Sequence, residues 1–350
     1  MRSAETGCPI EVYSHNARIV KHRLLIQRDP SPTHRRGLAS QIQSKTKAPP
    51  HNRSAGLSSS AILHRPSASA AARMALSAEA NTATWAEKRV SFKNAKGEQI
   101  IGISVDTGSE DVAILCHGLG DHKDGFVLPQ MAAALAEKGH SSLRFDFPGN
   151  GESDGTFRYA NMKEEKEDIR AAVLYLRAQG RSVTGLVGHS KAGTGVILYA
   201  ADYDDIARVV NVAGRYDNMR GITERFGDDI FDYLDKHGQM EVSWPSSVPG
   251  SGGKKTWILT QEDIKNRREL FMEPYAKAIR NSHVLTIHGK ADETIPFEDA
   301  LSYHKQLAKS ELVLVDGAGH NFNKSTHADV LIQHTVEFLT SGKVLGKLHK

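Results

Sequence analysis

The sequence of 350 residues predicts an α/β protein with a mostly parallel sheet and helices on both faces of that sheet. Three observations carry this prediction. Short apolar runs of strand length recur from about residue 87 onward. Those after residue 110 alternate with stretches of helical periodicity, which is typical of β-α-β units. Finally, 39% of the residues are hydrophobic and 25% are charged, a composition that can bury a large core.

Eight runs are expected to form the strands of this sheet. They are R-V-S-F, Q-I-I-G-I-S-V, V-A-I-L-C, S-L-R-F-D-F, V-T-G-L-V, A-R-V-V-N-V, H-V-L-T-I and E-L-V-L-V. The first two are close enough in sequence to pair as an antiparallel hairpin at one edge. Helices are expected at 127–138, 162–178, 191–201, 297–308 and 326–340.

One long connection, about 214–281, breaks the alternation between strands and helices. It holds Trp244, Trp257 and the Pro/Ser/Gly-rich patch W-P-S-S-V-P-G-S-G-G. Connections of this length are rarely without structure. We therefore expect a cap insertion over the carboxyl edge of the sheet.

Residues 1–80 differ in composition from the rest of the chain. They hold 12 Lys and Arg against 4 acidic residues, so their net charge is +8, whereas the remaining 270 residues carry −4. They are rich in Ser, Ala and Arg and lack apolar periodicity, as transit peptides and disordered extensions do. Met74 offers an alternative start. We expect a leader over 1–80 and the folded domain over 81–350, located in a plastid or mitochondrion if the leader is a transit peptide and otherwise in the cytoplasm.

Several classes of protein are excluded by what the sequence lacks. No run approaches the about 18 to 20 apolar residues of a membrane helix. Cys8 lies in the predicted leader, whereas Cys116 ends an apolar run, so a structural disulfide between them is not expected. We therefore expect a soluble protein in a reducing, intracellular compartment. The sequence has no basic stripe with interleaved aromatic residues, so it gives no indication of nucleic acid binding. Neither G-N-G-E-S-D-G nor G-S-G-G-K-K-T has the spacing of a nucleotide loop, and no metal-ligand set appears. We expect no cofactor and no metal.

The segment V-T-G-L-V-G-H-S-K-A-G-T-G, residues 183–195, predicts a strand, a sharp turn and a helix. Small residues at Gly188, Ala192 and Gly193 leave room for a serine on so tight a turn. The pattern departs from G-x-S-x-G only at Ala192, the next smallest residue. Ser190 is therefore the candidate nucleophile, and the alternative is an ordinary helix start.

A serine nucleophile needs a general base and an acid that orients it. Asp292 follows the run H-V-L-T-I, and His320 follows the run E-L-V-L-V, each in a loop at the carboxyl end of a predicted strand. The order Ser190, Asp292, His320 is that of the hydrolase triad. Asp316 and Glu293 are rival acids. Asp292 is preferred because it directly follows the strand turn.

Two backbone amides are candidates for an oxyanion hole. One belongs to Lys191, directly after the nucleophile. The other belongs to Leu119, between Gly118 and Gly120 in the H-G-L-G-D-H loop that follows V-A-I-L-C. The Lys191 side chain is expected to be solvated at the start of its helix.

These motifs resemble those of α/β-hydrolase-fold serine hydrolases, in particular the serine aminopeptidase-like or monoglyceride-lipase-like group, over about residues 87–341. The segment R-F-D-F-P-G-N-G-E-S-D-G at 144–155 is similar to a segment of that group, and cinnamoyl and feruloyl esterases share its R-F-D-F and S-D-G sequences. The resemblance implies that Arg144, Asp146 and Ser153 are structural and that a cap shapes substrate choice.

The motifs together predict a serine hydrolase that cleaves a carboxylic ester, or a related thioester or amide, through an acyl-enzyme. Its partner is a small-molecule acyl substrate. Because fold does not give function, a ligand-sensing protein or an acyltransferase on the same scaffold stays open as the alternative.

Overall fold

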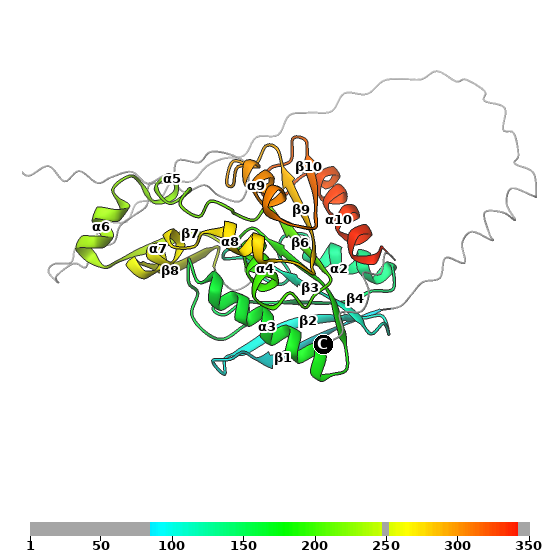
Figure 1. Ribbon diagram of the computed structural model, residues 1–350. Coiled ribbons are helices and arrows are strands. Elements are labelled where there is room, and N and C mark those ends of the chain that lie inside the picture. The colour runs from blue at the N-terminus through cyan, green and yellow to red at the C-terminus, as the bar shows by residue number, and fades with distance from the viewer. Residues whose placement is uncertain (1–84, 247–251, 342–350) are drawn as a thin grey trace, which may run out of the picture. The chain divides into compact units, whose positions relative to one another are not determined.

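An eight-stranded sheet forms the centre of the folded domain (Figure 1). The computed structural model describes residues 85–246 and 252–341, so the predicted leader, Met74 and Cys8 lie outside the described residues. Strand order is β1-β2-β4-β3-β5-β6-β9-β10. The strands are β1 (Ala86–Lys93), β2 (Gln99–Asp106), β3 (Asp111–Cys116), β4 (Ser141–Phe145), β5 (Ser182–His189), β6 (Arg208–Val212), β9 (His283–Gly289) and β10 (Ser310–Val315).

The sheet is mostly parallel, as predicted. The β1 and β2 strands pair antiparallel, and β2 pairs antiparallel with β4. All other neighbours from β4 to β10 are parallel. The predicted α/β fold with an antiparallel hairpin at one edge is therefore confirmed.

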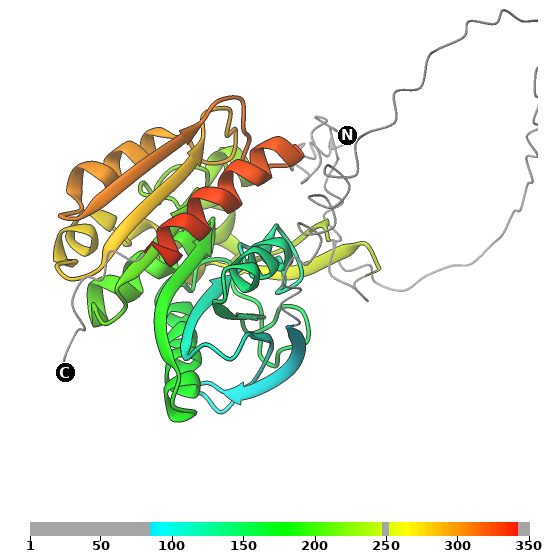
Figure 2. The same ribbon diagram turned by 90° about the vertical axis from the view of Figure 1, so that its right-hand side faces the viewer.

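Helices cover both faces of this sheet (Figures 1 and 2). One face packs against α2 (Leu128–Glu137) and α10 (Ser325–Thr340). The other packs against α3 (Met162–Ala178) and α4 (Lys191–Tyr203), with α8 (Met272–Ala278) beside α4. The helix α9 (Glu298–Gln306) joins β9 to β10.

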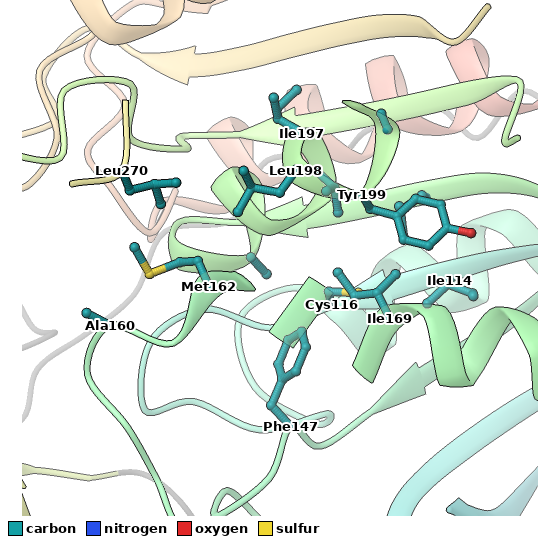
Figure 3. Close-up of a cluster of buried hydrophobic side chains, with 14 of the residues drawn as sticks. Ile114, Cys116, Phe147, Ala160, Met162, Ile169, Ile197, Leu198, Tyr199 and Leu270 are labelled. Carbon is teal, nitrogen blue, oxygen red and sulfur yellow. The ribbon is translucent and has the colours of Figure 1, made fainter. Parts of the chain in front are cut away.

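Alternation along β3 shows why both faces need cover. Successive side chains of a strand point to opposite faces. Ile114 and Cys116 belong to the cluster beneath α3 and α4, whereas Ala113 and Leu115 belong to the cluster beneath α2 and α10. Figure 3 shows Ile114 and Cys116 close to Ile169 of α3. The apolar run V-A-I-L-C is thus buried on both sides.

Between β6 and β9 the chain forms an inserted segment, which we define as residues 214–281. Its elements are α5 (Thr223–Phe226), α6 (Ile230–His237), β7 (Gln239–Pro245), β8 (Lys254–Thr260), α7 (Gln261–Arg268) and α8. The β7 and β8 strands pair as an antiparallel hairpin. Thr260 begins α7 with a reciprocal capping box with Asp263. Within the described ranges, no helix is long and apolar enough to cross a membrane.

Candidate active site

Ser190 occupies a strained turn between β5 and α4. Its φ of 56° and ψ of −115° lie where side-chain-bearing residues are rarely found. Its amide donates to the Val212 carbonyl of β6 at 2.8 Å, which fixes the turn above the sheet. A Cβ added at Gly188 would overlap the carbonyl of Ala192, so only glycine fits that position. The small residues that the sequence places around Ser190 are therefore sterically required.

Ser190, His320 and Asp292 form one hydrogen-bonded chain. The Ser190 Oγ lies 2.9 Å from His320 Nε2, and His320 Nδ1 lies 2.7 Å from Asp292 Oδ2. The three residues come from the ends of β5, β10 and β9, because carboxyl ends of parallel strands meet at one edge of the sheet. The side chain of Asp292 is fully buried, and that of His320 is 9% exposed.

Four donors surround the Asp292 carboxylate. The amides of Thr294 and Ile295 both donate to Oδ1 at 2.8 Å, while His320 and His288 face Oδ2. Burial by itself would raise the pKa of Asp292, but the charge of His320 and the hydrogen bonds from His288, His320 and Ile295 outweigh it. The pKa is therefore held below its usual range, and the side chain stays an anion.

His288 is a residue that sequence reasoning missed. Its fully buried Nε2 donates to the Ile295 carbonyl at 2.9 Å and lies 3.1 Å from Asp292 Oδ2. Since a carbonyl only accepts, Nε2 carries a hydrogen and points it toward the carboxylate as well. A signal for this residue existed in the sequence, because His288 lies next to the end of β9 and precedes Asp292 by four residues.

The rival acids lie away from the imidazole. The Asp316 side chain is 84% exposed and pairs with Lys290 at 2.7 Å. Glu293 is exposed on the surface. Of the three candidate acids, the structure brings only Asp292 to His320.

The H-G-L-G loop after β3 lies against the turn that carries Ser190. A Cβ placed on Gly118 would lie 3.2 Å from the Cβ of Ser190. The Phe147 amide donates to His117 Nε2 at 3.0 Å, so His117 Nδ1 carries the hydrogen and donates to the Gly118 carbonyl at 2.8 Å. Holding this carbonyl fixes the peptide plane that ends in the Leu119 amide. Sequence reasoning assigned no role to His117.

The Lys191 amide belongs to the first turn of α4, where helix amides have no intrahelical acceptor. Its side chain is not solvated, and that expectation is wrong. The ammonium donates to the Glu165 carboxylate at 2.7 Å and to the Arg158 carbonyl at 2.8 Å. Both side chains of the Lys191–Glu165 pair are at most 7% exposed. Packing of α3 against α4 covers this cation.

The segment 144–155 is held by buried charges. Arg144 pairs with Glu87, and the Asp146 carboxylate accepts from the Lys123 ammonium at 2.9 Å. Ser153 Oγ donates to the Asp146 carbonyl at 2.7 Å. None of these contacts involves the triad.

Aromatic residues of the inserted segment reach the H-G-L-G loop. A Cβ added to Gly120 would lie 3.0 Å from the Trp244 ring of β7. Trp244 in turn packs against Trp257 and Phe157, with ring centroids 5.1 and 6.1 Å away.

A cavity of about 620 Å³ lies further along β8, and none of Ser190, Asp292 and His320 lines it. Among the described residues, no group of three or more His, Cys, Asp or Glu could hold a metal ion.

The sheet order, with a serine turn between β5 and α4, defines the fold of an α/β hydrolase. Comparisons with known proteins agree. The family model described as "Alpha/beta hydrolase family" matches residues 113–333, and the chain belongs to this family.

Individual relatives are distant. The uncharacterized protein YfhR of Escherichia coli is 26% identical over 265 residues, covering 73% of this chain and 82% of YfhR. The mitochondrial palmitoyl-protein thioesterase ABHD10 of Bos taurus is 21% identical over 202 residues, 57% of this chain and 63% of ABHD10. The structure of Est1E from Butyrivibrio proteoclasticus with bound ferulic acid matches at a TM-score of 0.56 and 20% identity, covering 71% of this chain and 97% of Est1E.

Proposed function

We propose that the protein is a serine hydrolase that cleaves a carboxylic ester, or a related thioester or amide, through an acyl-enzyme. One observation carries the proposal. The Ser190 Oγ, His320 and Asp292 are joined by hydrogen bonds of 2.9 and 2.7 Å at the carboxyl edge of the sheet. Nucleophile, base and orienting acid are thus in contact before any substrate binds.

The protonation states of Asp292 and His320 favour transfer of the Ser190 hydroxyl proton to His320. The Asp292 carboxylate only accepts, so His320 carries its hydrogen on Nδ1 and turns the lone pair of Nε2 to Ser190. His320 takes the serine proton as the oxygen attacks the carbonyl carbon. It then returns this proton to the leaving group as the acyl-enzyme forms. Water, deprotonated by the same imidazole, releases the acid and restores Ser190.

The amides of Leu119 and Lys191 receive the negative charge on the carbonyl oxygen in this proposal. Support comes from the contact of Gly118 with Ser190, from the place of Lys191 in the first turn of α4 directly after Ser190, and from the His117 bond that holds the Gly118 carbonyl. Loss of one such donor typically costs about 100- to 1000-fold in rate.

The substrate is a small acyl compound in this proposal. The comparisons offer two precedents, a thioesterase among the relatives and a ferulic acid complex among the structures. For location we propose a plastid or mitochondrion if residues 1–80 act as a transit peptide, and the cytoplasm otherwise. Sequencing the amino terminus of the native protein decides between them: a start at Met74 would favour the cytoplasm, and cleavage elsewhere would favour an organelle.

A panel of esters tests the reaction. p-Nitrophenyl esters of increasing chain length are assayed beside methyl ferulate, an acyl-CoA and an aminoacyl anilide. We expect Ser190→Ala to lose about 10⁶-fold in kcat and all labelling by a fluorophosphonate. Ser302→Ala, on the remote helix α9, is the matched control and should keep both.

Persistent labelling of Ser190→Ala would place the nucleophile elsewhere and refute the proposal. Labelling of the wild type without turnover of any substrate would favour the ligand-sensing alternative. Transfer of the acyl group to an added alcohol in preference to water would favour the acyltransferase.

A further inference from the structure

Arg225 forms no ion pair with any acidic residue in the part of the chain that the structure describes. It lies half-buried in α5 of the inserted segment. Its Cζ is 5.8 Å from the ring centroid of Tyr159 and 6.0 Å from that of Trp244. Within the described ranges, its guanidinium has no hydrogen bond or ion pair beyond these aromatic faces. Burial lowers the pKa of Arg225 to about 10, with no carboxylate opposing that effect.

The two buried arginines of the inserted segment, Arg215 and Arg267, both have hydrogen-bond acceptors. Arg267 Nε donates to the Asn218 carbonyl at 2.9 Å. Arg215 Nη2 donates to the Thr294 carbonyl at 2.7 Å. A desolvated charge that lacks a partner costs free energy, so a fold normally pairs it. Arg225 differs from these two arginines because no acceptor for it lies among residues 85–246 and 252–341.

The nearest acid does not fill this role. The Glu224 carboxylate accepts from the Gly221 amide at 2.9 Å and from the Thr223 hydroxyl at 3.1 Å. Asp299 accepts from the amides that follow Arg215, at Tyr216 and Asp217. Both carboxylates are thus engaged elsewhere.

Two side chains connect Arg225 with the loops around Ser190 and Asp292. On one side is Trp244, whose ring contacts Gly120 of the H-G-L-G loop next to Ser190. On the other is Arg215, close enough for the two positive charges to repel. Arg215 in turn is bonded to the loop that follows Asp292, at Thr294. The guanidinium is therefore one aromatic ring away from the loop proposed to hold the oxyanion.

Building on the proposed function, we propose that Arg225 binds a carboxylate carried by the substrate several bonds from the scissile carbonyl. A guanidinium binds a carboxylate with two parallel N–H bonds, and one positive charge matches one negative charge. The half-buried Trp244 ring, which lies between Arg225 and Gly120, would pack along the intervening carbon chain. The substrate class is thus a half-ester or half-thioester of a diacid, or an ester of a carboxylate-bearing alcohol.

Two substrate series test this inference in the full chain. The first compares p-nitrophenyl monoesters of adipic and suberic acid with the same esters capped by methyl. The second places the charge on the alcohol, comparing 4-carboxyphenyl butyrate with its methyl ester. The quantity measured is the ratio of kcat/KM for the charged ester to that for its capped partner.

We expect the wild-type ratio to exceed one in at least one series. Arg225→Gln should lower that ratio by about 10- to 100-fold, as expected for one lost hydrogen-bonded ion pair. Arg225→Lys should give an intermediate ratio, because lysine keeps the positive charge but lacks the two parallel N–H groups of the guanidinium. Arg220→Gln removes an exposed cation from the same segment and should leave the ratio unchanged. Thermal unfolding of each variant confirms that it is folded.

Turnover of capped esters with no preference for charged ones in either series would overturn the role of Arg225 and leave the hydrolase proposal intact. An equal ratio in wild type and Arg225→Gln would do the same. If no ester is turned over, suberic acid monoamide is titrated into Ser190→Ala by calorimetry. Binding that requires Arg225 would uphold the carboxylate site, and absence of binding would overturn it.

Discussion

Replacement of Asp292 by asparagine tests how the imidazole is oriented. The two carboxylate oxygens of Asp292 have different donors. Oδ1 accepts from two backbone amides, those of Thr294 and Ile295, and Oδ2 faces the His320 and His288 imidazoles. The two backbone donors would hold the asparagine carbonyl at the Oδ1 position. The amide NH₂ group would then take the place of Oδ2.

An NH₂ group at that position cannot accept from His320 Nδ1 and must donate to it. The imidazole would then carry its hydrogen on Nε2, pointing at the Ser190 Oγ that lies 2.9 Å away. Without a lone pair there, no base removes the serine proton. We expect kcat to fall about 10⁴-fold, as for other triads held in the wrong tautomer. At about 1.36 kcal/mol per decade this is about 5 kcal/mol of barrier.

The assay is steady-state hydrolysis of the best p-nitrophenyl ester, together with the rate of fluorophosphonate labelling. Asp316→Asn makes the same chemical change at the exposed rival acid and should retain full activity. Thermal unfolding checks the fold, because the new NH₂ also meets the N–H of His288, at a cost of about 1 to 3 kcal/mol. Retention of more than a tenth of kcat by Asp292→Asn would refute the tautomer argument.

Two further predictions concern stability. Lys191→Met should lower the free energy of unfolding by about 3 to 5 kcal/mol in denaturant titrations, because it leaves the buried Glu165 carboxylate unpaired. Adding Glu165→Gln should recover part of this loss, and a single-variant loss below about 1 kcal/mol would mean that the pair is solvated. Burial raises the pKa of Asp168 to about 7. Its protonated carboxyl therefore stabilises the fold fully below about pH 4, and that contribution is lost as pH rises through 7. Asp168→Asn should flatten this fall in the free energy of unfolding between pH 4 and 7, and an unchanged slope would contradict the assignment.

The sheet could be predicted from sequence because its central strands, such as β3, β6 and β9, are buried on both faces and are therefore rich in apolar residues. Every predicted run lies on a strand of the sheet, and the five predicted helices begin and end within two residues of the observed ones. Two predicted runs extend past their strands: A-R-V-V-N-V starts one residue before β6, and S-L-R-F-D-F continues two residues beyond β4. The β4 strand ends at Phe145 because the Asp146 carboxylate turns to accept from the Lys123 amide at 2.6 Å and from its ammonium.

The contacts between distant side chains could not be predicted in this way. Lys191 is buried because α3 brings Glu165 to it, and no local pattern records that contact. His117 and His288 act on backbone carbonyls whose positions depend on the finished loops. For the β7 strand a local signal did exist. In M-E-V-S-W the buried Met240 alternates with exposed residues, as a half-buried strand does.

The contact between Trp244 and Gly120 means that the inserted segment is not an exchangeable module. Gly120 has a φ of 68°, and the space beside it is occupied by the indole ring. A chimera that received another family member's insertion would remove this ring and leave the H-G-L-G loop without its support. Any redesign of substrate choice in this chain must therefore alter the insertion and that loop together, and laboratory evolution should yield paired substitutions in the two.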